Sequence, residues 1–133
     1  MKLQLSKILG YLQLFIGMGA VAGALPMIIT PDGSDQGLSL QLLQDTPFND
    51  YLFPGIILLF VNGIGSLVAS YISLKLLKPA GLMGIAFGIA LMIWILVQLY
   101  LLGYVSWLQP FYLALGTLEL VIGFVLFRRF GKN

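Results

Sequence analysis

The sequence predicts an all-α protein, namely a membrane-spanning antiparallel four-helix bundle with a short outer capping segment. Composition is the first observation: the 133 residues are 59% hydrophobic and 9% charged, with a mean hydropathy of +1.00. Such values lie outside the range of soluble globular domains. The second observation is that the chain divides into four apolar runs, each long enough to cross a bilayer as a helix. We therefore expect one transmembrane domain over residues 1–133.

The first predicted span, 8–29, follows a short segment that carries Lys2 and Lys7. A cleaved signal peptide is the alternative, because these lysines resemble its basic start and 23–25 resembles a small-residue cleavage site. The run is long for a signal peptide, and glycines interrupt it at spacings that suit helix packing. We favour a retained span that ends near Pro26 and the turn-forming residues after it.

Residues 30–50 form the predicted outer loop and cap. Asp32 and Asp35 do not match the spacing of an EF-hand calcium loop, which favours a solvated turn. The apolar stretch 38–44 is too short to span, so we expect a short helix or extended piece at the membrane interface, closing the bundle mouth. Thr46 followed by Pro47 is typical of a helix start.

Three further spans are predicted at 51–74, 80–102 and 107–127. The second is entered through Pro54 and Gly55, where we expect a kink near the outer surface. Its small and polar residues share one helical stripe: Gly55, Leu59, Asn62, Ser66, Ala69 and Ser73. In the third span one face carries small residues, an aromatic ring and an amide: Gly84, Gly88, Leu91, Trp94, Ile95 and Gln98.

Charge predicts the orientation. In a four-span arrangement one side holds every basic residue, namely Lys2, Lys7, Lys75, Lys78, Arg128, Arg129 and Lys132. The other side holds Asp32, Asp35, Asp45 and Asp50. The positive-inside rule then places both termini in the cytoplasm of a multi-pass protein, and we expect the bacterial inner membrane.

Glu119 is the only formally charged side chain far from the ends of any span. It shares a helical face with Tyr112, Gly116 and Gly123, which predicts that this face points into the bundle. Counting from the basic boundary, its depth matches Gly17, Ser66 and Gly88. An ionised carboxylate there would cost about 2.5–3.5 kcal/mol on insertion scales, so we expect a protonated acid that bonds to Asn62 or Ser66.

These residues define a candidate interior ligand site. Its predicted polar members are Glu119, Asn62, Ser66 and Gln98, with Trp94 and Tyr112 as aromatic walls. Two interpretations of Glu119 stay open. It either holds the fourth helix to the second as a neutral hydrogen-bonding group, or it serves as a ligand, proton or cation site.

Enzyme chemistry is not expected. The chain contains no cysteine and no histidine, which removes thiol chemistry, imidazole catalysis and the usual zinc sites. The spans offer Glu119 no second catalytic group, and no nucleotide-binding fingerprint is present. We expect no metal and no cofactor. The pI near 9.0 reflects topology rather than nucleic-acid binding, because the basic residues stand beside apolar runs.

Two segments resemble a family of small, uncharacterised four-span bacterial integral membrane proteins. The first runs over 45–55 and on into Asn62 and Gly63, with Pro54 and Gly55 as its clearest mark, and the second covers 108–116. The resemblance extends over most of the chain from Asp45 onward. It implies the four-span fold and a bacterial inner membrane, and it implies no activity.

The leading hypothesis is a non-enzymatic inner-membrane protein whose interior polar site binds a small apolar or lipid-like ligand, or a partner helix. The alternative is an oligomeric proton- or cation-coupled transporter or channel in which Glu119 titrates. Four helices are few for a translocation path, so this alternative requires a homo-oligomer, formed through Gly84 and Gly88 or through Gly19 and Gly23. Membrane lipids are expected partners in either case.

Overall fold

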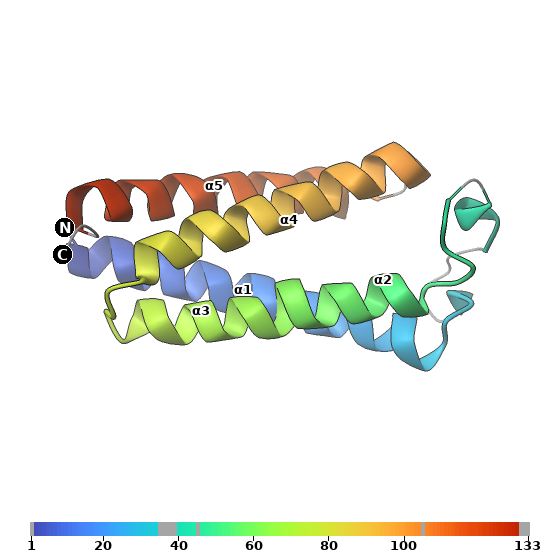
Figure 1. Ribbon diagram of the computed structural model, residues 1–133, viewed down its shortest axis with the longest axis horizontal. Helices are drawn as coiled ribbons and strands as arrows, with labels where there is room; N and C mark the ends of the chain where they lie inside the picture. The colour runs from blue at the N-terminus through green and yellow to red at the C-terminus, as the bar shows by residue number, and fades with distance from the viewer. Residues whose placement is uncertain (1, 35–39, 45, 105, 131–133) are drawn as a thin grey trace.

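The computed structural model describes residues 2–34, 40–44, 46–104 and 106–130, and over these residues the protein is an all-helical antiparallel bundle (Figure 1). The predicted fold class is confirmed. Its elements are α1 (Lys2–Ile29), η2 (Leu40–Leu43), α2 (Leu52–Ile57), η3 (Leu58–Ile64), α3 (Gly65–Leu74), α4 (Ala80–Leu102) and α5 (Leu108–Phe130). Since α2, η3 and α3 follow one another without a break, they form one rod. The four rods are each long and apolar enough to cross a membrane.

The first helix is longer than the predicted span. It begins at Lys2, so that Lys2 and Lys7 lie in its first two turns, and it runs through Pro26 to Ile29. Proline has no amide hydrogen to donate to the Ala22 carbonyl, yet the helix continues for about one more turn. The helix closes beyond it, where the Thr30 amide donates to the Pro26 carbonyl at 2.8 Å.

The second rod begins later than the Thr46–Pro47 pattern predicts. Thr46 forms a turn instead, since its hydroxyl donates to the Leu43 carbonyl at 2.8 Å and accepts from the Phe48 amide. Helix α2 starts at Leu52, whose amide donates to the Asp50 carboxylate at 3.0 Å. Asp50 therefore satisfies one of the free amides at the helix start.

The irregular helical turn of this rod lies after Pro54 and Gly55, where the kink was predicted. Pro54 occupies the first turn of α2, where a missing amide hydrogen removes no intrahelical bond. The widened turn is the π-helical segment η3, which contains Asn62 and Gly63. Gly63 faces α1, because a Cβ on it would lie 2.9 Å from Val21 Cγ2.

Helices α4 and α5 pack against each other, and their backbones are in direct contact over residues 81–88 of α4. A Cβ on Gly88 would lie 2.7 Å from the Leu120 nitrogen, and one on Gly123 would lie 2.7 Å from the Gly84 carbonyl carbon. Gly81 is equally close to the Phe127 nitrogen. Small residues allow this approach in membrane bundles. Gly84 and Gly88 are therefore covered within the chain, and an oligomer would need another face.

Helix α1 packs against the second rod, so the bundle consists of two helix pairs. Gly10 of α1 lies against Leu74, and Gly17 lies against Leu67 and the Gly63 carbonyl. The pairs meet in a cluster of Leu9, Ile122 and Leu126 at the end where α1 begins and α5 ends. At the opposite end Leu43 of η2 packs with Met27 and Tyr51, as expected of a cap.

The two ends differ in charge. Among the described residues, the basic end carries Lys2, Lys7, Lys75, Lys78, Arg128 and Arg129, while the acidic end carries Asp32 and Asp50. The predicted positions of Asp35, Asp45 and the start of the 38–44 segment lie outside the described residues. We use "basic end" and "acidic end" below for these two ends of the bundle.

Candidate functional site

Glu119 has no exposed surface, and it projects from α5 toward α1. Its Oε2 accepts a hydrogen bond from Gln13 Nε2 at 3.1 Å. The partner is thus Gln13, and not the predicted Asn62 or Ser66. Gln13 reaches Glu119 because α1 lies between α5 and the second rod in the basic half of the bundle, and its side chain is also fully buried.

Gln13 connects Glu119 to the end of α3 as well. The Ser73 hydroxyl donates to Gln13 Oε1 at 2.8 Å, and the Ser73 carbonyl accepts from the Ser6 hydroxyl at 2.6 Å. One turn earlier on α3, the Ser70 hydroxyl donates to the Gly10 carbonyl at 2.7 Å. All of these side chains are buried. Together they form a polar network of Ser6, Gln13, Ser70, Ser73 and Glu119, which ties α1 to both α3 and α5.

Three buried oxygens have no hydrogen-bond partner among the described residues: Asn62 Oδ1, Ser66 Oγ and Glu119 Oε1. Asn62 and Ser66 are each 1% exposed. Buried polar atoms without a partner are uncommon in native proteins, so each of these three oxygens needs an explanation.

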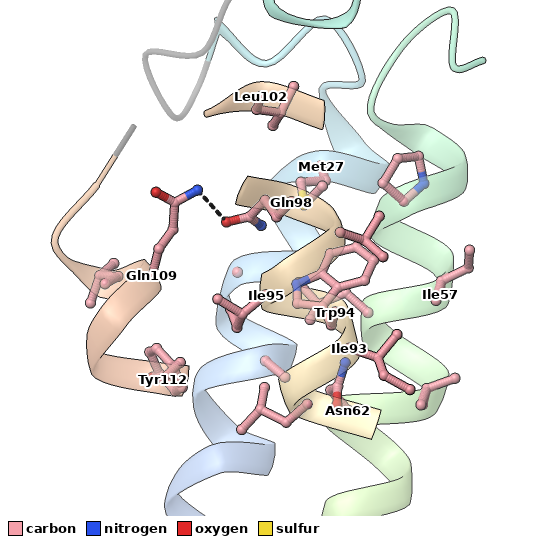
Figure 2. Close-up of a pocket in the computed structure, with 18 of the residues that line it drawn as sticks. Met27, Ile57, Asn62, Ile93, Trp94, Ile95, Gln98, Leu102, Gln109 and Tyr112 are labelled. Atoms are coloured by element: carbon pink, nitrogen blue, oxygen red, sulfur yellow. Dashed lines mark hydrogen bonds between the residues drawn. The ribbon is translucent and has the colours of Figure 1, made fainter. Parts of the chain in front are cut away.

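A cavity of about 650 Å³ lies between the helices in the acidic half of the bundle (Figure 2). Helices α1, α2, α4 and α5, together with η2 and η3, all contribute to its lining, which is almost entirely apolar. Its volume falls within the range of small-molecule sites. Asn62 lies at the deep end of the cavity, toward the middle of the bundle. Trp94 of α4 lies close to Asn62 (Figure 2).

Two amide side chains, Gln98 and Gln109, lie at the acidic end of the cavity. Gln109 Nε2 donates to Gln98 Oε1 at 2.9 Å and to the Gly103 carbonyl at 3.2 Å (Figure 2). Gln109 therefore fixes the turn between α4 and α5. Gln98 lines the cavity as predicted for a site residue, but its oxygen is already engaged.

Tyr112 forms the cavity wall on α5. Its hydroxyl lies directly against Gly19 of α1, where a Cβ would collide with it. Its ring stacks on Phe15, with centroids 6.3 Å apart and an interplanar angle of 13°. Gly19 is therefore covered within the chain and does not offer a free face for an oligomer.

The six predicted site residues thus separate into two groups. Asn62, Trp94, Gln98 and Tyr112 line the cavity, whereas Glu119 and Ser66 are not among its lining residues. Glu119 belongs to the polar network in the basic half. The predicted depth match holds for Gly88, which packs against Gly116 and Leu120 on either side of Glu119.

The sequence interpretation missed Gln13 and its serine partners. A signal was present, because Ser6, Gly10, Gln13 and Gly17 are spaced four, three and four positions apart and so share one face of α1. This is the same kind of small and polar stripe that was recognised in the second and third spans.

Comparisons with protein-family models, with curated proteins and with solved structures find no match to this chain. The resemblance to four-span bacterial membrane proteins therefore stays a prediction.

Proposed function

We propose that this protein is a non-enzymatic integral protein of the bacterial inner membrane that binds a small apolar or lipid-like ligand inside its bundle. The observation that carries the proposal is the 650 Å³ apolar cavity, which every rod of the bundle helps to line. Sites for small molecules are concave and mostly apolar, with a few polar groups that orient the ligand. The cavity is only partly enclosed by the four rods, and its volume falls within the range of small-molecule sites, which favours a small ligand over a partner helix.

The distribution of charge supports an orientation for this site. If both termini are cytoplasmic, as the positive-inside rule predicts, the basic end faces the cytoplasm and the cavity lies in the outer half of the membrane. A ligand would then reach it from the outer leaflet or from the periplasmic side.

In this proposal Glu119 positions the helices and does not contact the ligand. Its bond to Gln13 joins α5 to α1, and Gln13 in turn bonds to Ser73 of α3. The network thereby holds the two helix pairs together in the basic half, and the cavity lies between the same pairs in the acidic half.

Gly23 offers the sharpest test. It lines the cavity, and among the described residues a Cβ on it would meet only Leu58 Cδ2, at 3.8 Å. Gly23→Leu should therefore fill part of the cavity without forcing helices apart. Ala114→Leu is the matched control, since Ala114 is exposed on α5.

We expect native mass spectrometry to detect a copurifying apolar molecule on the unmodified protein and on the Ala114→Leu variant, and to detect at least about tenfold less on Gly23→Leu. A tenfold change corresponds to about 1.4 kcal/mol of binding free energy. Equal occupancy of all three proteins, or none on any of them, would contradict the proposal.

A second candidate function is proton- or cation-coupled transport by a homo-oligomer. The observation that favours it is Glu119 Oε1, a buried carboxyl oxygen without a partner among the described residues. Proteoliposomes that carry a pH-sensitive dye test it. Transport predicts proton flux that Glu119→Gln abolishes, whereas the leading proposal predicts no flux that depends on Glu119.

A further inference from the structure

Asn62 is a polar side chain at the deep end of the cavity, and its amide nitrogen points toward Trp94 (Figure 2). Its Oδ1 has no hydrogen-bond partner among the described residues and points away from the cavity. The residue is 1% exposed, so bulk solvent does not hydrate the amide nitrogen. A buried polar group without a partner destabilises a protein, and a ligand that brings an acceptor to this nitrogen would gain a directional contact.

The backbone holds Asn62 at this place. It lies in the π-helical segment η3, a type of widened turn that occurs frequently at functional sites. The next residue, Gly63, is pressed against Val21, and its carbonyl lies close to Gly17. Because these contacts fix η3 against α1, the side chain of Asn62 stays directed at the cavity.

The other amides on the cavity wall are already paired. Gln98 and Gln109 bond to each other at the acidic end, and Gln109 also bonds to the Gly103 carbonyl. The cavity therefore has the Asn62 amide nitrogen at its deep end and two amides that bond to each other at its acidic end (Figure 2).

The lining contains no Lys, Arg, Asp or Glu among the described residues. An ionised headgroup inside it would lose its hydration and gain no counter-charge, which is strongly unfavourable. Tyr51, Trp94 and Tyr112 instead offer broad apolar ring surfaces along the walls. The chemistry of the cavity therefore selects an uncharged ligand.

On the basis of the proposed function, we infer that the ligand is an uncharged, hydroxyl-bearing apolar molecule, whose hydroxyl bonds to Asn62 and whose hydrocarbon part lies along Trp94 and Tyr112. A hydroxyl suits this amide because its oxygen can accept a hydrogen bond from Asn62 Nδ2. A fatty alcohol has this chemistry and serves as the probe.

Trp94 provides the reporter, since the chain has only two tryptophans. The Trp107→Phe variant leaves Trp94 alone in the cavity. The Trp94→Phe variant leaves Trp107, whose side chain is 64% exposed at the turn, as a reporter of the surrounding lipid. Fluorescence quenching is measured in bilayers with a mid-chain bromododecanol and with the matched bromododecane, each corrected for its partitioning.

We expect the alcohol to quench Trp94 at a mole fraction about fivefold to tenfold lower than the alkane, as one buried hydrogen bond predicts. On this background Asn62→Leu should abolish the preference for the alcohol while the alkane still quenches. Ala114→Leu, which changes an exposed position of α5 outside the cavity, should preserve the preference.

Two results would overturn the inference and leave the proposed function standing: equal quenching by alcohol and alkane in the parent protein, or a preference that survives Asn62→Leu. A different result would overturn the proposed function itself. That result is quenching of Trp94 by both probes only to the level that Trp107 reports for the bulk lipid.

Discussion

Glu119 is held by an amide and not by a charge. Gln13 donates to its Oε2 at 3.1 Å and accepts from Ser73 at the other end of the same amide group. An amide is a suitable partner in a bundle interior, because it adds no second charge to bury. Gln13 therefore links three helices through one side chain, and its replacement should remove hydrogen bonds to both α3 and α5.

Substitution of Glu119 should distinguish hydrogen bonding from charge. Glu119→Gln keeps an oxygen that can accept from Gln13, so we expect a change in the free energy of unfolding below about 1 kcal/mol. Glu119→Leu leaves Gln13 Nε2 buried without a partner, and we expect a loss of about 1–3 kcal/mol. Denaturant unfolding in detergent, followed by circular dichroism, measures both.

A double substitution provides the control for this pair. If the two side chains act through their bond, Glu119→Leu combined with Gln13→Leu should cost less than the sum of the single changes. Additive losses would show that Gln13 and Glu119 do not stabilise the bundle through each other.

Asp32 gives a prediction about pH in the outer loop. Its Oδ1 accepts from the Ser34 backbone amide at 2.9 Å, and this bond, together with the Ser34 hydroxyl, lowers the pKa of Asp32 below its usual value of 3.8. Because the folded pKa is the lower one, the ionised carboxylate stabilises the turn at neutral pH. That contribution is lost as the pH falls through the folded pKa.

Carboxyl-carbon NMR titration should show this lowered pKa for Asp32. Ser34→Pro removes the main donor and should return the pKa of Asp32 toward 3.8, whereas Ser34→Ala keeps the backbone amide and should keep most of the lowering. An Asp32 pKa that is the same in all three proteins would contradict the assignment.

At the residue scale, the sequence predicted which side chains face inward better than it predicted which ones meet. Asn62, Ser66 and Glu119 are all buried. Matching depth along helices assumes that a side chain bonds to its level neighbour, however, and Gln13 is long enough to bridge α3 and α5. The hydrogen-bond partner of a buried side chain thus depends on side-chain length and on helix rotation. The spacing of residues along one helix predicts neither.

The connection after α3 is an element that stores strain. The Leu77 amide donates to the Ile72 carbonyl and the Leu76 amide to the Ser73 carbonyl, which is the bonding pattern of a Schellman motif. This motif needs a left-handed residue, usually glycine, and here Leu76 has φ 58°. A leucine in this conformation costs roughly 1–2 kcal/mol.

Leu76→Gly should therefore stabilise the protein by about 1 kcal/mol, because glycine adopts this conformation without a steric penalty. Leu76→Ala is the control, since alanine keeps the Cβ and should give no gain. Thermal unfolding of both variants in the same detergent measures the difference. A Leu76→Gly protein no more stable than Leu76→Ala would show that the turn is not strained.

Alanine should have different effects at two glycines, Gly123 in the α4–α5 interface and Gly23 on α1. Gly123→Ala places a Cβ 2.7 Å from the Gly84 carbonyl carbon and from the Ile85 nitrogen, both backbone atoms that cannot rotate away. We expect a loss of about 1–3 kcal/mol, as for other overpacked positions. The Cβ of Gly23→Ala meets only Leu58, at 3.8 Å, among the described residues, and this change should be neutral, or stabilising by about 0.5–1 kcal/mol.

Unfolding in detergent compares these two variants directly. A smaller loss for Gly123→Ala than for Gly23→Ala would contradict the packing described for the α4–α5 interface.

At the element scale, hydrophobic runs predicted the second, third and fourth spans to within three residues of their ends. The start of α1 was predicted six residues late, because Lys2 and Lys7 interrupt the apolar run but not the helix. The π-helical segment η3 was not predicted. It depends on how closely Gly63 approaches α1, a contact between segments that are distant in the sequence.

At the scale of the whole molecule, the two helix pairs explain why the cavity lies where it does. In the basic half the pairs are joined by the Gln13–Glu119 bond and by the cluster of Leu9, Ile122 and Leu126. In the acidic half α2, η3 and α4 stand apart around the cavity. The sequence predicted the bundle and named four of the residues that line the cavity, but the cavity itself results from the separation of two pairs, which no single span reveals.

Orientation is the prediction on which the direction of ligand entry depends. Since the chain has no cysteine, single cysteines can be introduced on a clean background. Ser34→Cys marks the acidic end, and Leu77→Cys marks the basic end without removing a charge; Leu77 is exposed in the connection after α3. If the basic residues lie in the cytoplasm, a membrane-impermeant maleimide should label the Ser34→Cys protein in spheroplasts and the Leu77→Cys protein only after permeabilisation.

The opposite labelling pattern would place the cavity in the cytoplasmic half and reverse the route of its ligand. The same membranes can decide between these routes. With the basic end inside, a brominated alcohol confined to the outer leaflet should quench Trp94 at once, whereas the same probe loaded into the inner leaflet should quench only as fast as it crosses the bilayer. The charges at the helix ends would then determine which leaflet supplies the ligand. The cavity itself has no charged side chain among its described lining residues.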